Sequence, residues 1–556
     1  MKDYLKYRHK LIIVLILVLA AFFRLYGLNW DQNQHLHPDE RFLTMVVTAI
    51  KTSQSFLVYL NPKISPMNPV NVGYDFFVYG TFPLYLTKVV GELLGYHDYT
   101  NIHFVGRFFS AFFDLGVVFL VFKIGRKVYD EKVGLWAAFL YSIMVLPIQL
   151  SHFFTVDTFL NFFIVLSFYL LVLLTTHYSL LATTFLGISF GLALACKVSA
   201  LYFLPIIGLG YFYLLGHSWK KKRIFRKVFF SGLLFLVASY LTLRLNQPSI
   251  FASSNFLDFH PNPQLLANFE QLKSFNQPDT WFPPSIQWKK TKAIIFPLKN
   301  LVFWGLGLPL GIIAIVATAV GVTSKQKTLA QFLILFWVLA LFLYQGTQFC
   351  KTMRYFLPIY PFLALLSAQF LKRVKRPLVG YLLLVVLLVY PFSFLSIYTR
   401  PITRVTASEW IYQHLAAGST LANEHWDDPL PLYLPGENPG QYKIEMLSLY
   451  DPETPGKWEK INSQLERTDY IILSSNRLYG SIPQHPDYYP KTSLYYQSLF
   501  DGSLGFEKVA EFTSYPCFPP IKPYLFCLPD DWAEEAFTVY DHPKVIIFKK
   551  SGFNKG

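Results

Sequence analysis

The sequence predicts a mainly α-helical polytopic membrane protein with an extracytoplasmic α/β domain at its C-terminal end. Hydrophobic residues make up 53% of the 556 residues and charged residues only 15%. Apolar runs long enough to cross a hydrocarbon core as helices recur through the first 400 residues. Residues 401–556 instead have the composition of a soluble domain.

The formal net charge of +15 would suggest a nucleic-acid partner if the protein were soluble. The charge is unevenly divided, however. Residues 401–556 contain 13 Lys and Arg against 20 Asp and Glu, whereas residues 1–400 contain 36 against 14. Because the excess of positive charge belongs to the apolar part, we expect membrane lipid and no nucleic acid as a partner.

About eleven transmembrane helices are predicted from the apolar runs. The runs cover residues 10–29, 103–123, 133–150, 156–175, 179–196, 200–216, 228–244, 301–321, 328–345, 354–371 and 377–397. The stretch Tyr79–Leu94 is more amphipathic than these, because it contains Pro83, Lys88 and Glu92. We expect it to lie in the membrane interface and not to span the bilayer.

The basic residues predict the orientation, because short cytoplasmic loops collect Lys and Arg. With eleven spans and a cytoplasmic N-terminus, the inner segments hold 20 of the 36 basic residues of the apolar part. A span at Tyr79–Leu94 would move the later basic clusters to the outer side. The first run could be a cleaved signal, but it continues past Phe22 without a small-residue cleavage site. We therefore expect a multi-pass plasma-membrane protein with a retained first helix and an extracytoplasmic C-terminal domain.

Two domains are predicted: a transmembrane module at 1–400, with large outer loops at 30–102 and 245–300, and a soluble domain at 401–556. In the latter, ASEWIYQHL and TSLYYQSLF predict helices, and DYIILSS predicts a buried strand. FTVYDHPKVIIFKK predicts a terminal strand pair around an Asp-His-Pro turn. Cys517 and Cys527 could form a disulfide or remain free thiols, and no zinc-site spacing occurs.

The first outer loop contains the most informative polar stretch, RLYGLNWDQNQHLHPDERF. Asp39 and Glu40 are adjacent carboxylates close to the membrane surface, where a general base could meet a substrate that emerges from lipid. The alternative interpretation is a solvated loop in which Asp39 caps the helix ERFLTMVVTAI.

Further charged residues lie at the ends of the predicted spans or within them, where charge is costly and often functional. Each alone fits a snorkelling charge or a structural ion pair, but all lie on the predicted outer side. Outer cations suit the phosphate of a lipid carrier, so the pattern indicates transfer of a group from a lipid phosphate. These residues are Arg107 and Asp114 on one span, His152 and Asp157 in the next outer turn, Lys197 and Arg354.

These motifs, in this order, resemble a known family. An arginine and an Asp-Glu pair follow the first span, Gly-Arg opens the second, an acid lies in the next outer turn, and GLALxxK and RYxLPxYP segments follow. Over residues 10–400 the chain resembles the protein O-mannosyltransferase and aminoarabinose transferase group of C-type (GT-C) membrane glycosyltransferases. Its C-terminal segments are similar to those of uncharacterised bacterial and archaeal members.

The resemblance implies a hexosyl or pentosyl transferase that moves one sugar from a polyprenyl-phosphate carrier to an acceptor hydroxyl, with inversion, on the outer membrane face. By position, Asp39 would be the catalytic base and Glu40 would support it, while Asp157 matches an outer-turn acid. The positions that would contact the substrate or the carrier phosphate are Arg107, His152, Lys197, Arg354 and Tyr355.

The acceptor implied by the resemblance is a glycan, a lipid or a protein. The sequence differs from the mannosyltransferase branch of this group, because its outer loops contain no inserted β-trefoil-like domain. This difference argues against a protein acceptor. Aromatic residues of the 245–300 loop could stack on sugars or anchor the loop at the interface. Glu424, Asp427 and Asp428 in NEHWDDPLP could bind a cation or an acceptor, or form a turn. The displacement requires no metal, and we expect no cofactor, with a divalent metal as the alternative.

Two other protein classes compete with the transferase. A transporter or lipid flippase would also have many spans with intramembrane charges, but the charges here lie on one side and no inverted repeat is visible. A membrane-anchored scaffold would not need eleven spans.

Overall fold

The computed structural model describes residues 2–374 and 376–552. The chain forms two compact units, which are described separately. The helical unit comprises the residues up to Leu28, Pro38–Lys273 and Ile294–Pro391. The C-terminal unit comprises Asn29–His37, Ser274–Ala293 and the residues from Phe392 onward. Two short segments of the predicted outer loops therefore belong to the same compact unit as the C-terminal domain.

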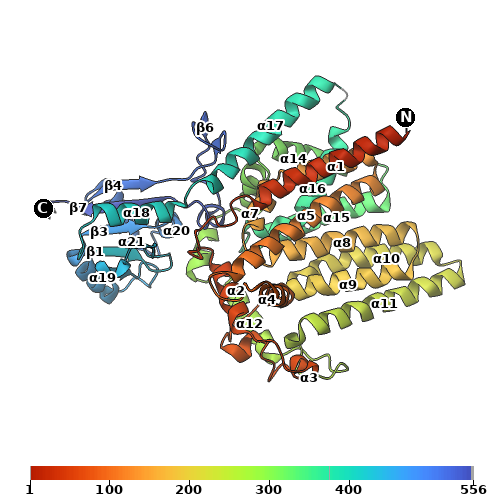
Figure 1. The fold of residues 1–556 in the computed structure, drawn as a ribbon, viewed down its shortest axis with the longest axis horizontal. Helices are drawn as coiled ribbons and strands as arrows, with labels where there is room; N and C mark the ends of the chain where they lie inside the picture. The colour runs from red at the N-terminus through yellow and green to blue at the C-terminus, as the bar shows by residue number, and fades with distance from the viewer. Residues whose placement is uncertain (1, 375, 553–556) are drawn as a thin grey trace. The chain divides into compact units, whose positions relative to one another are not determined.

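The helical unit is built from long apolar helices, of which α8 to α11 lie side by side (Figure 1). The longer helices are α1 (Lys2–Leu25), α5 (Ile102–Val128), α6 (Glu131–Ser142), α7 (Val145–Ser151), α8 (Asp157–Thr176), α9 (Leu180–Cys196), α10 (Leu204–Ser218), α11 (Lys222–Asn246), α14 (Leu308–Thr323), α15 (Leu329–Thr347), α16 (Tyr360–Leu371) and α17 (Pro377–Leu395). Shorter elements connect them: α2 (Pro38–Ala49), α3 (Phe56–Leu60), η1 (Pro69–Val72), α4 (Phe82–Leu94), η2 (Val198–Phe203), η3 (Pro248–Ile250), α12 (Pro263–Ser274), α13 (Ile295–Asn300), η5 (Leu301–Gly305) and η6 (Met353–Ile359).

Close helix packing explains why small residues recur in α9. A β-carbon at Gly191 would lie 2.6 Å from the backbone oxygen of Ser239 in α11. Helices that pack in an apolar solvent gain stability from such close approach, because no hydrophobic effect drives them together.

Each of the eleven predicted spans falls on helix. Among the described residues, six helices are long and apolar enough to cross a bilayer, and a seventh candidate is the pair α6 and α7, which is bent by 59°. Helices α9 and α14 are apolar but shorter. The number of spans therefore stays a prediction. The doubtful stretch forms α4, a separate helix of 13 residues, in which Lys88 is buried and pairs with Glu92 at 3.3 Å.

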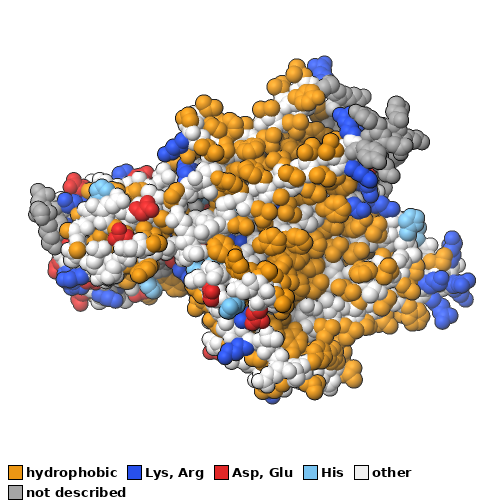
Figure 2. Space-filling model, in the orientation of Figure 1, with side chains coloured by type: hydrophobic (Ala, Val, Ile, Leu, Met, Phe, Trp, Pro, Cys, Tyr) orange, Lys and Arg blue, Asp and Glu red, His pale blue; other side chains and the backbone are white. Residues whose placement is uncertain are grey.

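The surface of the helical unit is typical of a protein in contact with lipid. Large hydrophobic side chains are exposed along its helices, among them Leu15 of α1, Phe212 of α10 and Leu236 of α11. Figure 2 shows them as broad hydrophobic areas, with Lys and Arg gathered where α10 meets α11. Apolar patches of this extent are rare on soluble monomers.

The C-terminal unit contains a five-stranded sheet with strand order β2-β1-β3-β7-β4. Strands β2, β1 and β3 are parallel, whereas β7 runs antiparallel to both of its neighbours. The main strands are β1 (Thr420–Glu424), β2 (Lys443–Leu447), β3 (Tyr470–Leu473), β4 (Phe506–Phe512) and β7 (Val545–Lys550). The helices and turns of this unit are η4 (Pro283–Trp288), η7 (Ser396–Thr399), α18 (Thr403–His414), η8 (Pro439–Gln441), α19 (Pro455–Arg467), α20 (Arg477–Ser481), η9 (Ile482–Gln484), α21 (Pro490–Asp501) and α22 (Glu535–Thr538).

Most sequence predictions for this unit are confirmed: α18 and α21 are the two predicted helices, and β3 is fully buried. The predicted terminal strand pair is wrong. Only β7 forms a strand, and Phe537 and Thr538 belong to the short helix α22. Both edges of β7 are already paired, with β3 and β4, so no edge remains for a strand from the preceding segment.

The loop segment Ser274–Ala293 contributes to the hydrophobic core of the C-terminal unit. Ile286 is fully buried in the cluster that also contains Tyr489, and the ring of Trp281 stacks on that of Tyr488. The aromatic residues of this loop thus have a packing role that the sequence left open.

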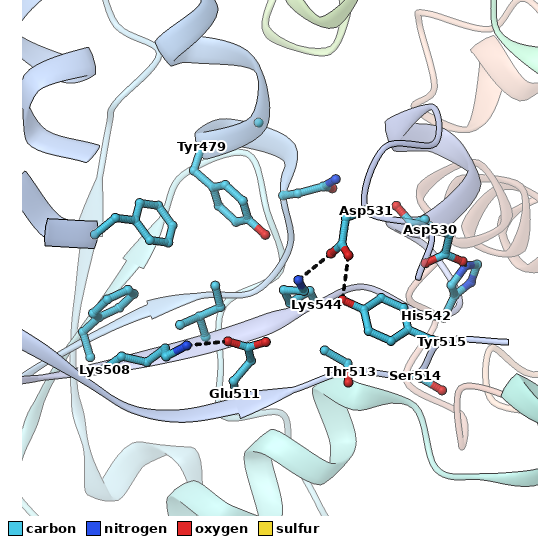
Figure 3. A pocket seen from close by; sticks show the side chains of 16 residues that line it. Tyr479, Lys508, Glu511, Thr513, Ser514, Tyr515, Asp530, Asp531, His542 and Lys544 are labelled. Atoms are coloured by element: carbon cyan, nitrogen blue, oxygen red, sulfur yellow. Dashed lines mark hydrogen bonds and ion pairs between the residues drawn. The ribbon is translucent and has the colours of Figure 1, made fainter. Parts of the chain in front are cut away.

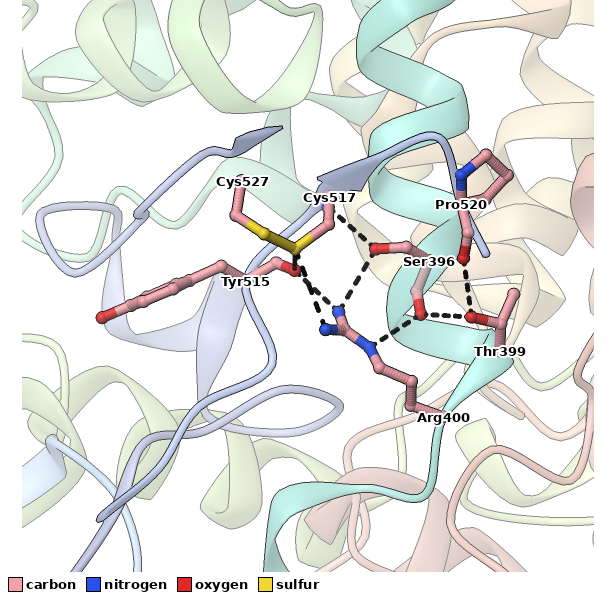
Figure 4. The surroundings of a disulfide bond; sticks show 7 residues. All are labelled: Ser396, Thr399, Arg400, Tyr515, Cys517, Pro520 and Cys527. Carbon is pink, nitrogen blue, oxygen red and sulfur yellow. Dashed lines mark hydrogen bonds between the residues drawn. A yellow bond between two sulfur atoms is a disulfide. The ribbon is translucent and has the colours of Figure 1, made fainter. Parts of the chain in front are cut away.

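Cys517 and Cys527 form a disulfide between the two-residue strands β5 (Cys517–Phe518) and β6 (Phe526–Cys527) (Figure 4). Arg400 fixes the surroundings of the bond: its guanidinium donates to the backbone oxygens of Tyr515 and Ser396 at 2.7 and 3.1 Å. The other two cysteines, Cys196 and Cys350, are buried and take no part in this disulfide.

Candidate active site

A pocket of about 280 Å³ opens in the helical unit between α8, η2, α15 and η6. One part of its wall is apolar, and the other carries charged and hydroxyl groups. Its lining consists of Val78, Tyr79, Asp157, Leu160, Ile164, Lys197, Val198, Ser199, Tyr202, Phe269, Leu272, Trp337, Leu341, Gln345, Arg354, Tyr355, Leu357 and Pro358. Such an amphipathic pocket suits a ligand with a polar head and an apolar tail.

Four residues predicted from the sequence meet in this pocket. Asp157 is the first residue of α8, and its carboxylate accepts a hydrogen bond from the Lys197 ammonium at 2.8 Å. The Lys197 ammonium also lies 4.9 Å from the centre of the Tyr355 ring, and the Arg354 guanidinium carbon lies 5.7 Å from it. Tyr355 therefore contacts both cations, as expected for an electron-rich ring between positive groups.

Asp39 reaches the same group of charges, because its carboxylate pairs with the Arg354 guanidinium. The side chains of Asp39 and Arg354 are 24% and 25% exposed, so a ligand can reach the pair. Asp39 lies within the first turn of α2, one residue after Pro38. It is therefore inside the helix and is not the residue that caps it.

Glu40 has a different environment from its neighbour. Its carboxylate accepts from Arg107 Nε at 3.0 Å and from the backbone N–H of Phe154 at 2.6 Å, and both Glu40 and Arg107 are completely buried. Arg107 Nη1 also donates to the backbone oxygen of Leu28 at 2.6 Å. In the structure, the Arg107 guanidinium is thus enclosed by protein groups and does not line the pocket.

Two further sequence candidates are also bound within the helical unit. His152 is buried, and its ring nitrogens lie 2.8 Å from the backbone oxygens of Ile148 and Tyr26. Asp114 pairs with Arg24 at 2.7 Å and not with Arg107, although the latter lies on the same helix. These contacts join separate helices and do not reach the pocket.

Tyr79 belongs to the site, although the sequence did not single it out. It lines the pocket, and Asp39, Arg354, Tyr355 and Asp157 are all close enough to influence its hydroxyl. Burial raises the pKa of Tyr79 well above its ordinary value, so the hydroxyl stays protonated.

Gly80 explains how Tyr79 is held in the pocket. Its N–H donates to the backbone oxygen of Cys196 at 2.9 Å, and a β-carbon there would lie 2.0 Å from the backbone oxygen of Ala195. Only glycine fits between these groups. The sequence signal was a Tyr-Gly dipeptide before a predicted amphipathic helix, which is too common to indicate a site.

Within residues 2–374 and 376–552, no group of three or more His, Cys, Asp or Glu side chains is arranged to hold a metal ion. Glu424, Asp427 and Asp428 do not form such a group. Asp427 and Asp428 both pair with Arg404, and Glu424 accepts from the hydroxyl of Tyr496.

Residues 84–243 match the family described as dolichyl-phosphate-mannose-protein mannosyltransferase. A search of curated proteins finds no match. Among solved structures, the chain is similar to the Archaeoglobus fulgidus oligosaccharyltransferase tethered with an acceptor peptide. The TM-score is 0.56 at 12% identity, over 99% of this chain and 89% of that one.

The same archaeal enzyme in complex with Zn and sulfate gives a TM-score of 0.51 at 13% identity, over 91% of this chain and 72% of that one. ArnT from Cupriavidus metallidurans bound to undecaprenyl phosphate gives 0.47 at 13% identity, over 85% and 94%. Part of the chain therefore matches this mannosyltransferase family, and the chain shares its fold with the archaeal oligosaccharyltransferase.

Proposed function

We propose that the protein transfers a single sugar from a polyprenyl-phosphate carrier to an acceptor hydroxyl at the pocket of the helical unit. The observation that carries this proposal is the pairing of two cations, Lys197 and Arg354, with an apolar wall in one pocket. A carrier lipid has the matching chemistry, because a phosphate joins an apolar chain to the sugar. The family match and the fold favour this function over a transporter.

The two cations would bind the carrier phosphate in different ways. Arg354 presents a planar fork of donors that can hold two phosphate oxygens, whereas Lys197 acts as a compact charge. Asp157 holds the Lys197 ammonium at 2.8 Å and would keep it directed at the pocket. Tyr355, which contacts both cations, would keep their separation fixed.

Arg354 also connects phosphate binding to the catalytic base. In the structure its guanidinium is paired with Asp39, and a carboxylate held in this way is a poor base. A carrier phosphate that competes for Arg354 would weaken this ion pair and raise the basicity of Asp39. The base would therefore become active when the donor is bound.

In the proposed step, Asp39 takes the proton of the acceptor hydroxyl while the hydroxyl oxygen attacks the anomeric carbon. The bond from that carbon to the phosphate oxygen breaks on the opposite face, and the carrier phosphate leaves with the bonding electrons. Attack opposite the leaving group inverts the anomeric configuration. Glu40 and Arg107 are positioning residues in this proposal, because their buried ion pair holds α2 against α5.

The experiment is sugar transfer by the purified full-length protein in nanodiscs, with radiolabelled polyprenyl-phosphate sugars as donors. Donors that carry a hexose or a pentose are compared, because the proposal does not fix the sugar. Free glycans, glycolipids and peptides are offered as acceptors. Asp39→Asn tests the base, and Asp75→Asn, in the same outer region and exposed, is the matched control. Equal loss of transfer in both variants would argue against the assignment.

We also propose that the N-terminus is cytoplasmic and the C-terminal unit extracytoplasmic, in the plasma membrane. The Cys517–Cys527 disulfide supports this side for the C-terminal unit, because disulfides persist in oxidising compartments. Single cysteines at the exposed positions Ser503 and Ser324 test the orientation in intact cells. The native cysteines are buried or disulfide-bonded, so background labelling should be low. An impermeant maleimide should label position 503 and not 324; the reverse would overturn the topology.

A further inference from the structure

The C-terminal unit contains a second pocket, of about 430 Å³, which the proposed transfer does not use. It lies between β4, β7, α20 and the segment that precedes α22 (Figure 3). Its lining residues are Asn476, Tyr479, Gly480, Phe500, Lys508, Glu511, Thr513, Ser514, Tyr515, Asp530, Asp531, Thr538, His542, Lys544, Ile546 and Phe548. All belong to one compact unit, so the pocket is complete within it.

Charged groups of the lining occur in balanced pairs. Lys508 Nζ donates to Glu511 at 2.8 Å along β4, and Lys544 pairs with Asp531. Figure 3 shows Tyr515 directed at the same carboxylate, and its hydroxyl donates to Asp531 at 2.7 Å. A site with balanced charge offers little net attraction to a polyphosphate or a free cation. Instead it presents donors and acceptors side by side.

His542 lies between two carboxylates at the pocket wall. Its ring nitrogens lie 2.5 Å from Asp541 and 3.0 Å from Asp530. The two carboxylates raise the pKa of His542 to about 10, so the imidazole carries a charge at neutral pH. Because both of its nitrogens already have partners, His542 shapes the pocket and does not act as a free base.

Aromatic rings form a second kind of surface in the same pocket. Tyr479 packs against Phe500 with ring centres 5.5 Å apart, and Phe500 packs against Phe548 at 5.7 Å. Phe500 is 50% exposed, although it lies at a pocket wall, and Figure 3 shows the Tyr479 hydroxyl directed into the pocket. An exposed ring face beside hydroxyl and charged groups suits a ligand that has both an apolar face and many hydroxyls.

We propose that this pocket binds a neutral saccharide, with the sugar ring against Phe500 and its hydroxyls bonded to the charged pairs. Vicinal hydroxyls both donate and accept hydrogen bonds, which matches the alternation of Lys508 with Glu511 and of Lys544 with Asp531. The inference goes beyond the proposed transfer reaction and does not depend on it. If the protein has a glycan acceptor, the pocket would hold a part of that glycan outside the reacting site.

Saturation-transfer NMR on the full-length protein in nanodiscs tests the proposal, with methyl α-mannoside, methyl β-galactoside and lactose as probes. Glu511→Gln and Phe500→Leu should each weaken binding by about tenfold, because one removes a charged acceptor and the other the ring face. The matched control is Glu507→Gln, since Glu507 is exposed on the same strand but does not line the pocket. Asp39→Asn should not change saccharide binding, although it should strongly lower the turnover of sugar transfer.

Three results would overturn the proposal. The first is the absence of saturation transfer from all three saccharides. The second is a saturation-transfer signal that does not change in Glu511→Gln and Phe500→Leu. The third is displacement of the saccharides by inorganic phosphate or acetate at lower concentrations than the saccharides themselves require, which would make the pocket an anion site. Sugar-transfer activity is measured on the same variants. This second measurement distinguishes a failure of the saccharide-pocket proposal from a failure of the proposed enzymatic function.

Discussion

Asp39 and Glu40 are neighbours in the sequence, yet their carboxylates have opposite environments. Asp39 is 24% exposed and pairs with an arginine that is itself 25% exposed, at the edge of a pocket. Glu40 is completely buried, pairs with the equally buried Arg107 and accepts a backbone N–H. Successive residues on a helix point about 100° apart, so one turn can direct one acid toward a substrate and the next into the protein. An accessible ion pair can exchange partners, whereas a buried one holds helices together.

The largest effect on turnover is expected from a change of Asp39, the accessible acid. Asp39→Asn keeps the size of the side chain but removes the basic oxygen, so turnover should fall by about 10² to 10⁴. The melting temperature should stay close to that of the wild type, because the pair with Arg354 is exposed to solvent. Transfer assays and thermal unfolding of the same preparation check both statements. A variant with wild-type turnover would remove Asp39 from catalysis and make Asp157 the next acid to test.

Breaking the buried pair should instead lower stability. Arg107→Ala leaves the Glu40 carboxylate buried without its cation, which typically costs about 3 to 5 kcal/mol. Thermal unfolding of the purified protein measures this loss. The double variant Glu40→Gln with Arg107→Met should recover much of it, because no charge then remains buried. If Arg107→Ala unfolds like the wild type but needs more donor, Arg107 contacts the carrier phosphate, as the family resemblance implied.

A smaller effect on activity is expected from a change of Arg354, the cation that can exchange Asp39 for the carrier phosphate. Arg354→Ala should raise the KM for the polyprenyl-phosphate sugar by roughly 10- to 100-fold, the usual loss for a hydrogen bond to a charged group. Arg354→Lys should recover only part of it, because the planar fork is lost. An unchanged KM in both variants would contradict phosphate binding by Arg354.

Glu424 provides a third case, a buried carboxyl that has no cation beside it. Burial raises its pKa to about 8, and Oε2 has no hydrogen-bond partner among the described residues. The folded state therefore retains a proton that the unfolded state releases above about pH 4.5. Stability should fall as the pH rises from about 4.5 to 8. Glu424→Gln should flatten this part of the profile of melting temperature against pH.

His542 also makes stability fall with rising pH, because its folded pKa of about 10 exceeds the ordinary 6.5. The Glu424→Gln profile must therefore be compared with that of the wild type, since a slope from His542 remains in both. A Gln variant with the wild-type slope below pH 6 would show that Glu424 does not hold its proton in the folded protein.

The sequence by itself determined the fold class, the positions of the helices and the α/β character of the C-terminal unit. Apolar runs and basic clusters are local properties, and they act within the span of a single helix or loop. The sequence also indicated that Asp39, Asp157, Lys197 and Arg354 take part in one reaction, the transfer of a group from a lipid phosphate. Local patterns alone could not separate Asp39 from Glu40, because both belong to one short motif, and only the family resemblance gave them different roles.

Only the tertiary structure decided which charges meet. The partners in the pairs Asp39–Arg354 and Glu40–Arg107 are 315 and 67 residues apart, and no local pattern specifies such contacts. Tyr79 enters the site because Gly80 fits against the backbone of Ala195 and Cys196 at the end of α9. These residues lie over a hundred positions later in the sequence. In the same way, segments 29–37 and 274–293 join the C-terminal unit through packing such as that of Trp281 on Tyr488. Packing and ion pairing depend on distance in space, which sequence separation does not reveal.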